Sequence, residues 1–204
     1  MPTDARQARR QQSHERILDA TAQQLYRSGI AGVGVADVMR QAGLTHGGFY
    51  AHFASRDALL VEAVEHAGRR SNAALAERLR GRAGAGKSPL RLLVEEYLSE
   101  AHMASMEAGC TVAALGSEMA RSSDGLREAS AGRVRALVDL VRDALPPGSG
   151  TDSATVIAAT MAGAIQMARV LGKDKGGPDI LRACSASLLA QYDRGQYDSD
   201  TPAR

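Results

Sequence analysis

The apolar residues of this chain recur at helical spacing in one segment after another, and glycines and prolines separate the segments. Between residues 13 and 28, for example, Ile17, Leu18, Ala22 and Leu25 fall on one helix face. No segment shows the convincing alternation of apolar and polar residues that a half-buried strand requires. Because the chain has no Trp and few other aromatic residues, its core must consist of smaller aliphatic side chains, which suit helices. We therefore predict an all-α protein.

Capping residues and helix breakers divide the chain into about nine predicted helices. These cover residues 13–28, 35–42, 45–53, 55–79, 89–107, 110–121, 124–145, 153–172 and 178–194. The residues before the first helix are polar and include Arg6, Arg9 and Arg10, so we expect a partly disordered basic arm there.

The charges are unevenly distributed along the chain. The net charge is +2 overall, but residues 1–56 contain seven Arg against four Asp or Glu and so carry +3. An excess of positive charge in one region is typical of a nucleic-acid-binding surface. If the charge is considered by itself, a basic surface that faces only solvent explains it equally well. We expect a DNA-binding domain over residues 1–56, with a three-helix helix-turn-helix, and a helical-bundle domain for sensing and dimerisation over residues 57–204.

Other functional classes find little support. No apolar stretch approaches the roughly 18 residues of a membrane span, and the polar N-terminus lacks the apolar core of a secretory signal. The two cysteines, Cys110 and Cys184, lie far apart, which fits a reducing cytoplasm. The histidines show no zinc-ligand spacing with these cysteines, and no nucleophile motif stands out. We expect no metal, no cofactor, no enzymatic activity and no membrane partner.

Residues 34–53 have the pattern of a helix-turn-helix, in which a glycine turn at Gly43 separates two short amphipathic helices. The second helix contains Gly47 and Gly48, although glycine in a helix costs about 1 kcal/mol relative to alanine. A helix whose backbone approaches a DNA duplex closely needs small residues there, which would explain both glycines. A simple helical corner is the alternative interpretation.

Three of the seven aromatic residues of the chain fall within the second helix of this motif. Phe49 and Phe53 are four residues apart and can face the core, whereas Tyr50 falls on another side and can donate its hydroxyl to a phosphate. Thr45 and His46 stand at the helix N-terminus, the part that usually meets base edges. For His46, a base contact and plain solvent exposure fit equally well.

The stretch from Gly29 to Val64 resembles the N-terminal DNA-binding domain of the TetR family of bacterial transcriptional regulators. The resemblance rests on Val35-Ala36-Asp37-Val38-Met39, Ala42-Gly43-Leu44-Thr45, Gly48-Phe49-Tyr50-Ala51-His52-Phe53 and Ser55-Arg56-Asp57-Ala58-Leu59-Leu60. It implies that residues 45–53 are the recognition helix and that Thr45, Gly47, Tyr50, His52 and Arg56 contact double-stranded DNA. The chain departs from the family at Gly34, where a capping Ser or Thr is usual, so phosphate contacts from that point are not expected.

A competing motif lies at Gly81–Ser88, which matches the G-x-x-x-x-G-K-[ST] pattern of a phosphate-binding loop. Such a loop follows a buried strand, whereas residues 73–80 read as the end of a helix. A flexible connection between helices explains the glycines equally well. A nucleotide-binding protein that uses this loop, and a helical scaffold that does not bind DNA, are the alternatives to a DNA-binding regulator.

The remainder of the chain resembles the regulatory domain of the family only loosely. The resemblance implies a small-molecule effector and a homodimer built from the last two long helices, residues 153–172 and 178–194. The first of these helices carries small residues that would let a second copy approach closely, namely Ala158, Ala159, Ala162, Gly163 and Ala164. An internal contact between helices of one chain explains the same residues.

Two groups of residues are candidates for the effector site. Tyr97 and the methionines Met103, Met106, Met119, Met161 and Met167 could line an adaptable apolar pocket, or they could be ordinary core. The segment Gly109–Glu118 resembles one in a subset of the family that includes electrophile-responsive repressors, where a cysteine opening a helix reacts. Cys110 is therefore a sensor candidate, with a buried inert thiol as the alternative. The function predicted is repression by occupancy of a palindromic operator, with release by a ligand or a thiol-reactive compound.

Overall fold

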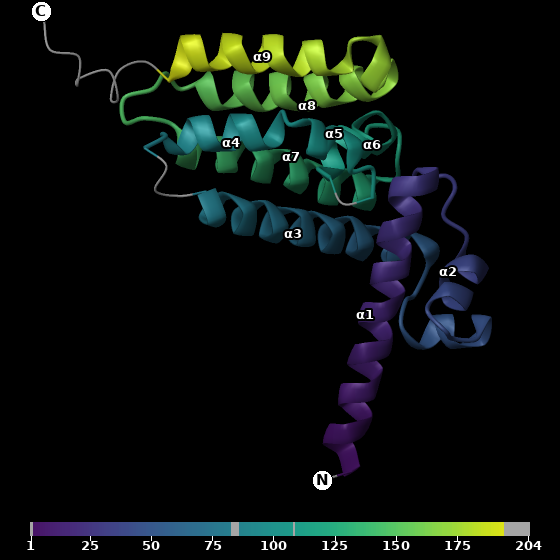
Figure 1. The fold of residues 1–204 in the computed structure, drawn as a ribbon. Coiled ribbons are helices and arrows are strands. Elements are labelled where there is room, and N and C mark those ends of the chain that lie inside the picture. The colour runs from purple at the N-terminus through teal and green to yellow at the C-terminus, as the bar shows by residue number, and fades with distance from the viewer. Residues whose placement is uncertain (1, 83–85, 108, 194–204) are drawn as a thin grey trace, which may run out of the picture.

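The computed structural model describes residues 2–82, 86–107 and 109–193, and all regular structure in these ranges is helical, as predicted (Figure 1). The elements are α1 (Pro2–Ser28), α2 (Val35–Gln41), the short 3-10 helix η1 (His46–Ala51), α3 (Arg56–Arg82), α4 (Pro89–Tyr97), α5 (Glu100–Ala104), α6 (Thr111–Met119), α7 (Asp124–Ala144), α8 (Ser153–Leu171), η2 (Lys173–Lys175) and α9 (Gly177–Tyr192).

One hydrophobic core joins α1, α2, η1 and the first half of α3. Its fully buried side chains include Ile17, Leu25, Met39 and Leu60. The boundary predicted at residue 56 falls on the first residue of α3, but this core continues along α3 and also takes in Leu115, Met119 and Leu126 from α6 and α7. The first elements of the chain are thus packed directly against α6 and the start of α7.

A second core lies between the other half of α3, α4, α7, α8 and α9. Helix α8 is central to it, because Ile157, Met161, Ile165 and Ala168 are completely buried. By length and composition alone α8 could cross a membrane, so the expectation that no stretch approaches such a length is wrong. Its apolar side chains pack against α7 and α9, and a core helix of this kind passes the same test.

Three predicted helix limits differ from those observed. Helix α1 begins at Pro2, and its N-terminal turns project away from the rest of the molecule (Figure 1). The helix predicted over residues 89–107 is broken after Leu98, because the Ser99 side chain accepts a hydrogen bond from the His102 amide and starts α5. The recognition helix is only the 3-10 segment η1, which is consistent with the low helix propensity of its two glycines.

Gly29 ends α1 in the left-handed region, with φ +71°, and a Cβ there would lie 2.4 Å from a carboxylate oxygen of Glu118. We expect Gly29→Ala to lower the free energy of unfolding by about 1 kcal/mol or more. Alanine would be strained in the left-handed backbone conformation, and its Cβ would displace the Glu118 carboxylate. Gly132→Ala is the matched control, because Gly132 lies inside α7 with open space around it, and alanine there should stabilise the helix. Urea unfolding of both variants measures the difference, and equal stabilities would contradict the expectation.

Candidate DNA interface and effector site

Two buried aromatic rings seat the recognition segment on the N-terminal core. Phe49 and Phe53 are each 2% exposed, and their ring centroids lie 5.8 Å apart. Tyr50 packs edge-on against Phe49 but remains 72% exposed. The three aromatic side chains are therefore placed as predicted. Phe49 and Phe53 hold the segment on the core, and Tyr50 faces solvent.

Thr45, His46 and Gly47, which precede Tyr50, are also exposed. A Cβ at Gly47 would meet nothing within 4 Å, so packing inside the protein does not require a glycine there. The neighbouring Gly48 faces inward, where a Cβ would meet Met39 and Thr45 at 3.7 Å. The open space at Gly47 is compatible with close approach of an external surface, and contact of Gly47 with DNA remains a prediction.

The other two predicted DNA contacts have partners inside the protein. The Arg56 guanidinium donates to the carbonyls of Ile30 and Val33 at 2.6 and 3.0 Å, and so fastens the loop that leads into α2. His52 is half-buried, its Nδ1 atom has no hydrogen-bond partner among the residues that the structure describes, and its ring lies 5.9 Å from that of His14. Burial lowers the pKa of His52, with smaller contributions from His14 and Arg10. Both residues help to position the recognition segment, whatever they contact outside.

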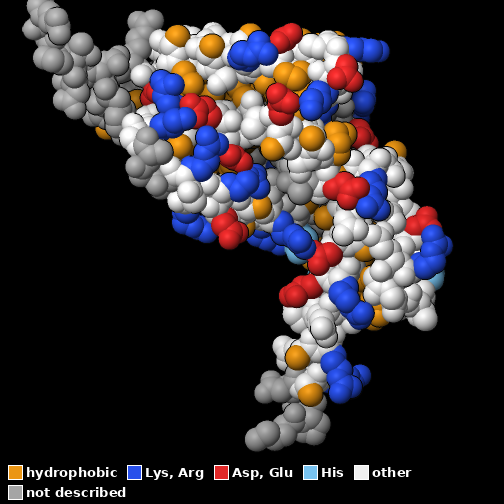
Figure 2. Space-filling view, viewed as in Figure 1, with side chains coloured by type: hydrophobic (Ala, Val, Ile, Leu, Met, Phe, Trp, Pro, Cys, Tyr) orange, Lys and Arg blue, Asp and Glu red, His pale blue; other side chains and the backbone are white. Residues whose placement is uncertain are grey.

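The basic N-terminal arm is part of α1 and reaches the recognition segment. Arg10 donates to the carbonyl of Ala51 at 2.8 Å. Arg6 and Arg9 lie about one turn or less before Arg10 on the same helix, and both are exposed. The space-filling view shows Lys or Arg side chains on this projecting part of the molecule (Figure 2). The excess positive charge of the sequence thus lies on the helix that contacts the recognition segment.

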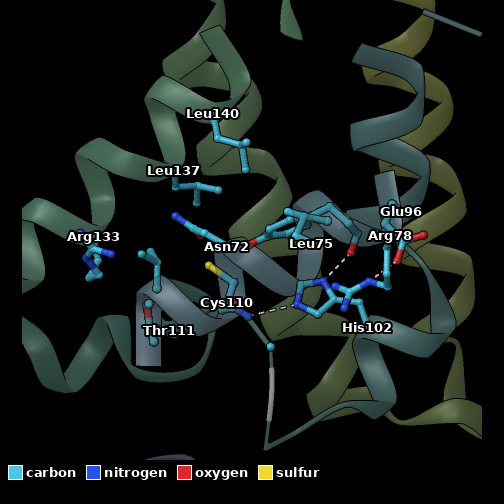
Figure 3. Close-up of a pocket in the computed structure, with 15 residues that line it drawn as sticks. Asn72, Leu75, Arg78, Glu96, His102, Cys110, Thr111, Arg133, Leu137 and Leu140 are labelled. Carbon is cyan, nitrogen blue, oxygen red and sulfur yellow. Dashed lines mark hydrogen bonds and ion pairs between the residues drawn. The ribbon is translucent and has the colours of Figure 1, made fainter. Parts of the chain in front are cut away.

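In the regulatory domain, Cys110 lies immediately before α6 and lines a small cavity between α3, α4, α6 and α7. Figure 3 shows Cys110 between His102 on one side and Arg133 on the other. The cavity measures about 20 Å³, which is room for about one water molecule. In this conformation the protein has no space there for an organic ligand.

The predicted sensor residues are only partly brought together. Tyr97 and Cys110 line the cavity just described. Met103 and Met106 line a different groove of about 440 Å³ beside Arg169, whereas Met161 and Met119 are buried in the two separate cores. The methionines therefore do not form one shared pocket.

His102, which no sequence pattern singled out, connects Tyr97 to Cys110. Its Nδ1 lies 2.6 Å from the carbonyl of Tyr97, and its Nε2 lies 3.2 Å from the Cys110 amide nitrogen (Figure 3). Because the amide can only donate, Nε2 must accept, and the proton of a neutral ring sits on Nδ1. Burial is the main cause of the lowered pKa of His102, which favours this neutral form. The ring thereby holds the start of α6 against the end of α4.

The loop that precedes Cys110 is bonded to the DNA-binding domain. The Tyr26 hydroxyl donates to the carbonyl of Gly109 at 2.8 Å. Arg27 forms two hydrogen bonds with the Glu107 carboxylate, at 2.7 and 3.0 Å, which lower the pKa of Glu107. Near the other end of α6, Glu118 accepts a hydrogen bond from the Ile30 amide at 2.8 Å. A displacement of α6 would therefore act directly on the C-terminal end of α1.

The residues of the phosphate-binding motif have other roles. Helix α3 continues to Arg82, so a helix and not a strand precedes the loop, of which residues 83–85 lie outside the described part of the chain. Lys87 forms an ion pair with Glu95 at 2.6 Å, and the Ser88 hydroxyl caps α4 by accepting from the Arg91 amide. This geometry favours a helix connection over a nucleotide site.

Comparisons with known proteins agree with this description. Residues 17–63 match the family described as bacterial regulatory proteins, tetR family. A Mycobacterium tuberculosis protein named as an uncharacterized HTH-type transcriptional regulator is 29% identical over 167 residues, which are 76% of this chain and 84% of that protein.

Solved structures share the fold over nearly the whole chain. A TetR transcriptional regulator from Chloroflexus aurantiacus has a TM-score of 0.74 at 24% identity, and the match covers 92% of this chain and 97% of that one. The reduced form of NemR from Escherichia coli has a TM-score of 0.72 at 22% identity, with 87% and 95% covered. Residues 17–63 are thus similar to the tetR family of bacterial regulatory proteins, and the chain as a whole shares its fold with solved structures of TetR transcriptional regulators.

Proposed function

We propose that the protein is a homodimeric repressor that binds a palindromic operator in the cytoplasm and leaves it when an effector acts on the regulatory domain. The observation that carries this proposal is the recognition segment, in which buried Phe49 and Phe53 present exposed Tyr50 to solvent. A rigid support for an exposed polar aromatic side chain suits phosphate or base contact in a major groove.

An exposed stripe on α8 supports the dimer. Val156, Thr160, Gly163, Met167 and Val170 follow one another at alternating spacings of four and three residues, the pattern of a helix–helix seam. Val170 is 87% exposed and Met167 is 59% exposed, which is unusual for apolar side chains along one helix. Figure 1 places α8 and α9 at the end of the molecule farthest from α2, where a second copy can pack without blocking DNA.

The small residues that suggested a dimer from sequence divide into two groups. Ala158, Ala162 and Ala164 are buried in the core of the single chain, where they let neighbouring helices pack closely. Ala159 is exposed and Gly163 is partly exposed, so these two are available to a second copy. The dimer proposal therefore rests on the apolar stripe and not on the alanine content of α8.

Selection from a pool of random DNA duplexes tests the proposed function. We expect the purified protein to enrich a palindrome with half-sites one helical turn, about 34 Å, or a multiple of it apart. Binding should weaken steeply with salt because phosphate contacts release counterions. If circular dichroism shows that the protein is folded and it still enriches no sequence at low salt, the proposal of an operator-binding repressor is wrong. The helical scaffold that does not bind DNA would then be the remaining alternative.

We expect alkylation of Cys110 by N-ethylmaleimide to release the wild-type protein from its operator. The added group cannot fit a cavity of about 20 Å³, so the start of α6 and the bonded Gly109 must move. Cys110→Ser should stay bound to DNA after the same treatment, whereas Cys184→Ser should be released like the wild type. Electrophoretic mobility shifts measure release, and mass spectrometry verifies which thiol reacted. Equal release of wild type and Cys110→Ser would show that Cys110 is not the sensor.

A further inference from the structure

The cavity beside Cys110 contains a positive charge that the protein itself does not neutralise. Arg133 of α7 forms no ion pair or hydrogen bond with any residue in the described ranges, and its Nε atom is buried without a partner. Its side chain lies across α3 at Gly68, where a Cβ would be only 2.4 Å from the Arg133 Cδ. The glycine thus makes room for the Arg133 side chain, which is partly exposed to solvent and has no charged partner in the described ranges.

A second unsatisfied donor faces the same cavity. The Tyr97 hydroxyl is buried, with the residue only 2% exposed, and the Cys110 thiol is the side chain that interacts with it, although by geometry it has no hydrogen-bond partner in the described part of the protein. Burial, with a contribution from Cys110, raises the pKa of Tyr97 well above its usual range, so the hydroxyl keeps its proton and can donate. Unpaired Arg133 and protonated Tyr97 are both suited to an acceptor that carries negative charge.

The other charges around the cavity do not cancel that of Arg133. Glu96, the carboxylate on its wall, is paired with Arg78 at 2.6 Å and with Arg82 at 3.0 Å. Arg169, which interacts electrostatically with Tyr97 and Cys110, donates only to backbone carbonyls and so adds a further positive charge. The electrostatic environment of the cavity is positive.

An apolar groove continues from the cavity along α3 and α7. Leu140 lines both spaces, and the groove beyond it, about 550 Å³ in volume, is open to solvent. Its apolar walls are Ala76, Leu79, Pro89, Leu92, Leu93 and Ala144, and the charged residues Arg80, Lys87 and Asp143 also line it. From Arg133 to Ala144 helix α7 rises by about 16 Å, at about 1.5 Å per residue. The cavity and the groove thus adjoin at Leu140.

We propose that the effector of this regulator is an amphipathic carboxylate, whose head group binds Arg133 and Tyr97 and whose unbranched apolar tail lies in the groove beyond Leu140. The inference rests on the proposed function and names the chemical class of the ligand. A carboxylate matches the planar guanidinium with two parallel hydrogen bonds. The groove is large enough for an alkyl tail, and most of the side chains that line it are apolar.

The small size of the head site connects this ligand to regulation. Leu75 of α3 is buried beside Leu137 and Leu140 of α7, and it must move away from them before the apolar tail can pass from the groove toward the head site. The effector therefore binds a conformation in which α3 and α7 lie farther apart than they do here. A ligand that binds one conformation more tightly shifts the population toward it, and α3 leads directly from the recognition segment.

Titration calorimetry with decanoate on the full-length protein tests the proposal. Decanoate should bind, while decanol, which lacks the charge, and acetate, which lacks the tail, should each bind at least tenfold more weakly. Arg133→Gln should lose about tenfold to a hundredfold in decanoate affinity. The matched control is Arg135→Gln, two residues along α7, because Arg135 is exposed and pairs with Glu128 at the surface.

The outcomes separate this proposal from the proposed function. Equal binding of decanoate and decanol, no binding of decanoate, or full affinity in Arg133→Gln would each overturn the carboxylate site even if the protein binds an operator. If the protein selects no DNA but still binds decanoate, the repressor proposal is wrong and the carboxylate site stands. If Arg133→Gln does not fold, Tyr97→Phe replaces it and should weaken decanoate binding several-fold.

Discussion

Replacement of both Met167 and Val170 by aspartate is expected to convert the protein into a folded monomer that no longer retains its operator. Both side chains are largely exposed on α8, so we expect the fold of the single chain to tolerate the change. In the proposed dimer the same positions would be covered, and each interface would bury unpaired carboxylates at a cost of several kcal/mol. Because the monomer contacts one half-site, its operator affinity should fall by about a hundredfold or more.

Sedimentation velocity and operator titration at matched protein concentrations measure this result. Val134→Asp is the control, because Val134 is also an exposed apolar residue but lies on α7, away from the stripe on α8. It should remain a dimer with unchanged operator affinity. A double aspartate variant that sediments as a dimer would show that the α8 stripe is not the dimer interface.

Tyr50→Ala is expected to weaken operator binding by about a hundredfold while leaving the unfolding transition unchanged. Loss of one hydrogen bond to a phosphate corresponds to roughly tenfold in affinity. A dimer carries the substitution in both recognition segments, so the effect applies twice. Tyr50 is 72% exposed, which is why the fold should tolerate the change.

The comparison variants for Tyr50 separate its hydroxyl from its ring. Tyr50→Phe should show most of the loss if the hydroxyl donates to DNA, and little loss if the ring packs against sugar or base. Met106→Ala is a suitable control, since Met106 is exposed to a similar degree in the regulatory domain. Operator affinity that is unchanged in Tyr50→Ala would remove Tyr50 from the DNA interface.

The sequence predicted the helices best where their apolar residues are periodic. The limits of α2 and of α6 to α9 agree with the expected ranges to within a few residues. The first turns of α1 were missed because residues 2–12 are polar and show no apolar face. The break after Leu98 was missed because apolar residues continue at helical spacing on both sides, and only the capping contact of Ser99 reveals it.

The candidate sites were predictable only in part, for a physical reason. The burial of Phe49 and Phe53 and the exposure of Tyr50 follow from local spacing on one short segment. In contrast, Arg133 lies against Gly68, and Arg56 donates to the carbonyl of Val33. Both contacts join residues far apart in the sequence, and the periodicity of apolar residues does not predict such contacts.

Helix α1 is attached near both of its ends to parts of the protein with different tasks. Arg10 is bonded to the recognition segment, and Tyr26 is bonded to the loop before Cys110. Between these residues α1 is a stiff rod about 24 Å long, at about 1.5 Å per residue. If such a rod pivots at one end, a tilt of about 5° moves the other end by about 2 Å. A tilt of α1 about its Tyr26 end, set by a rearrangement beside Gly109, would therefore displace the recognition segment bonded to Arg10 by about that amount.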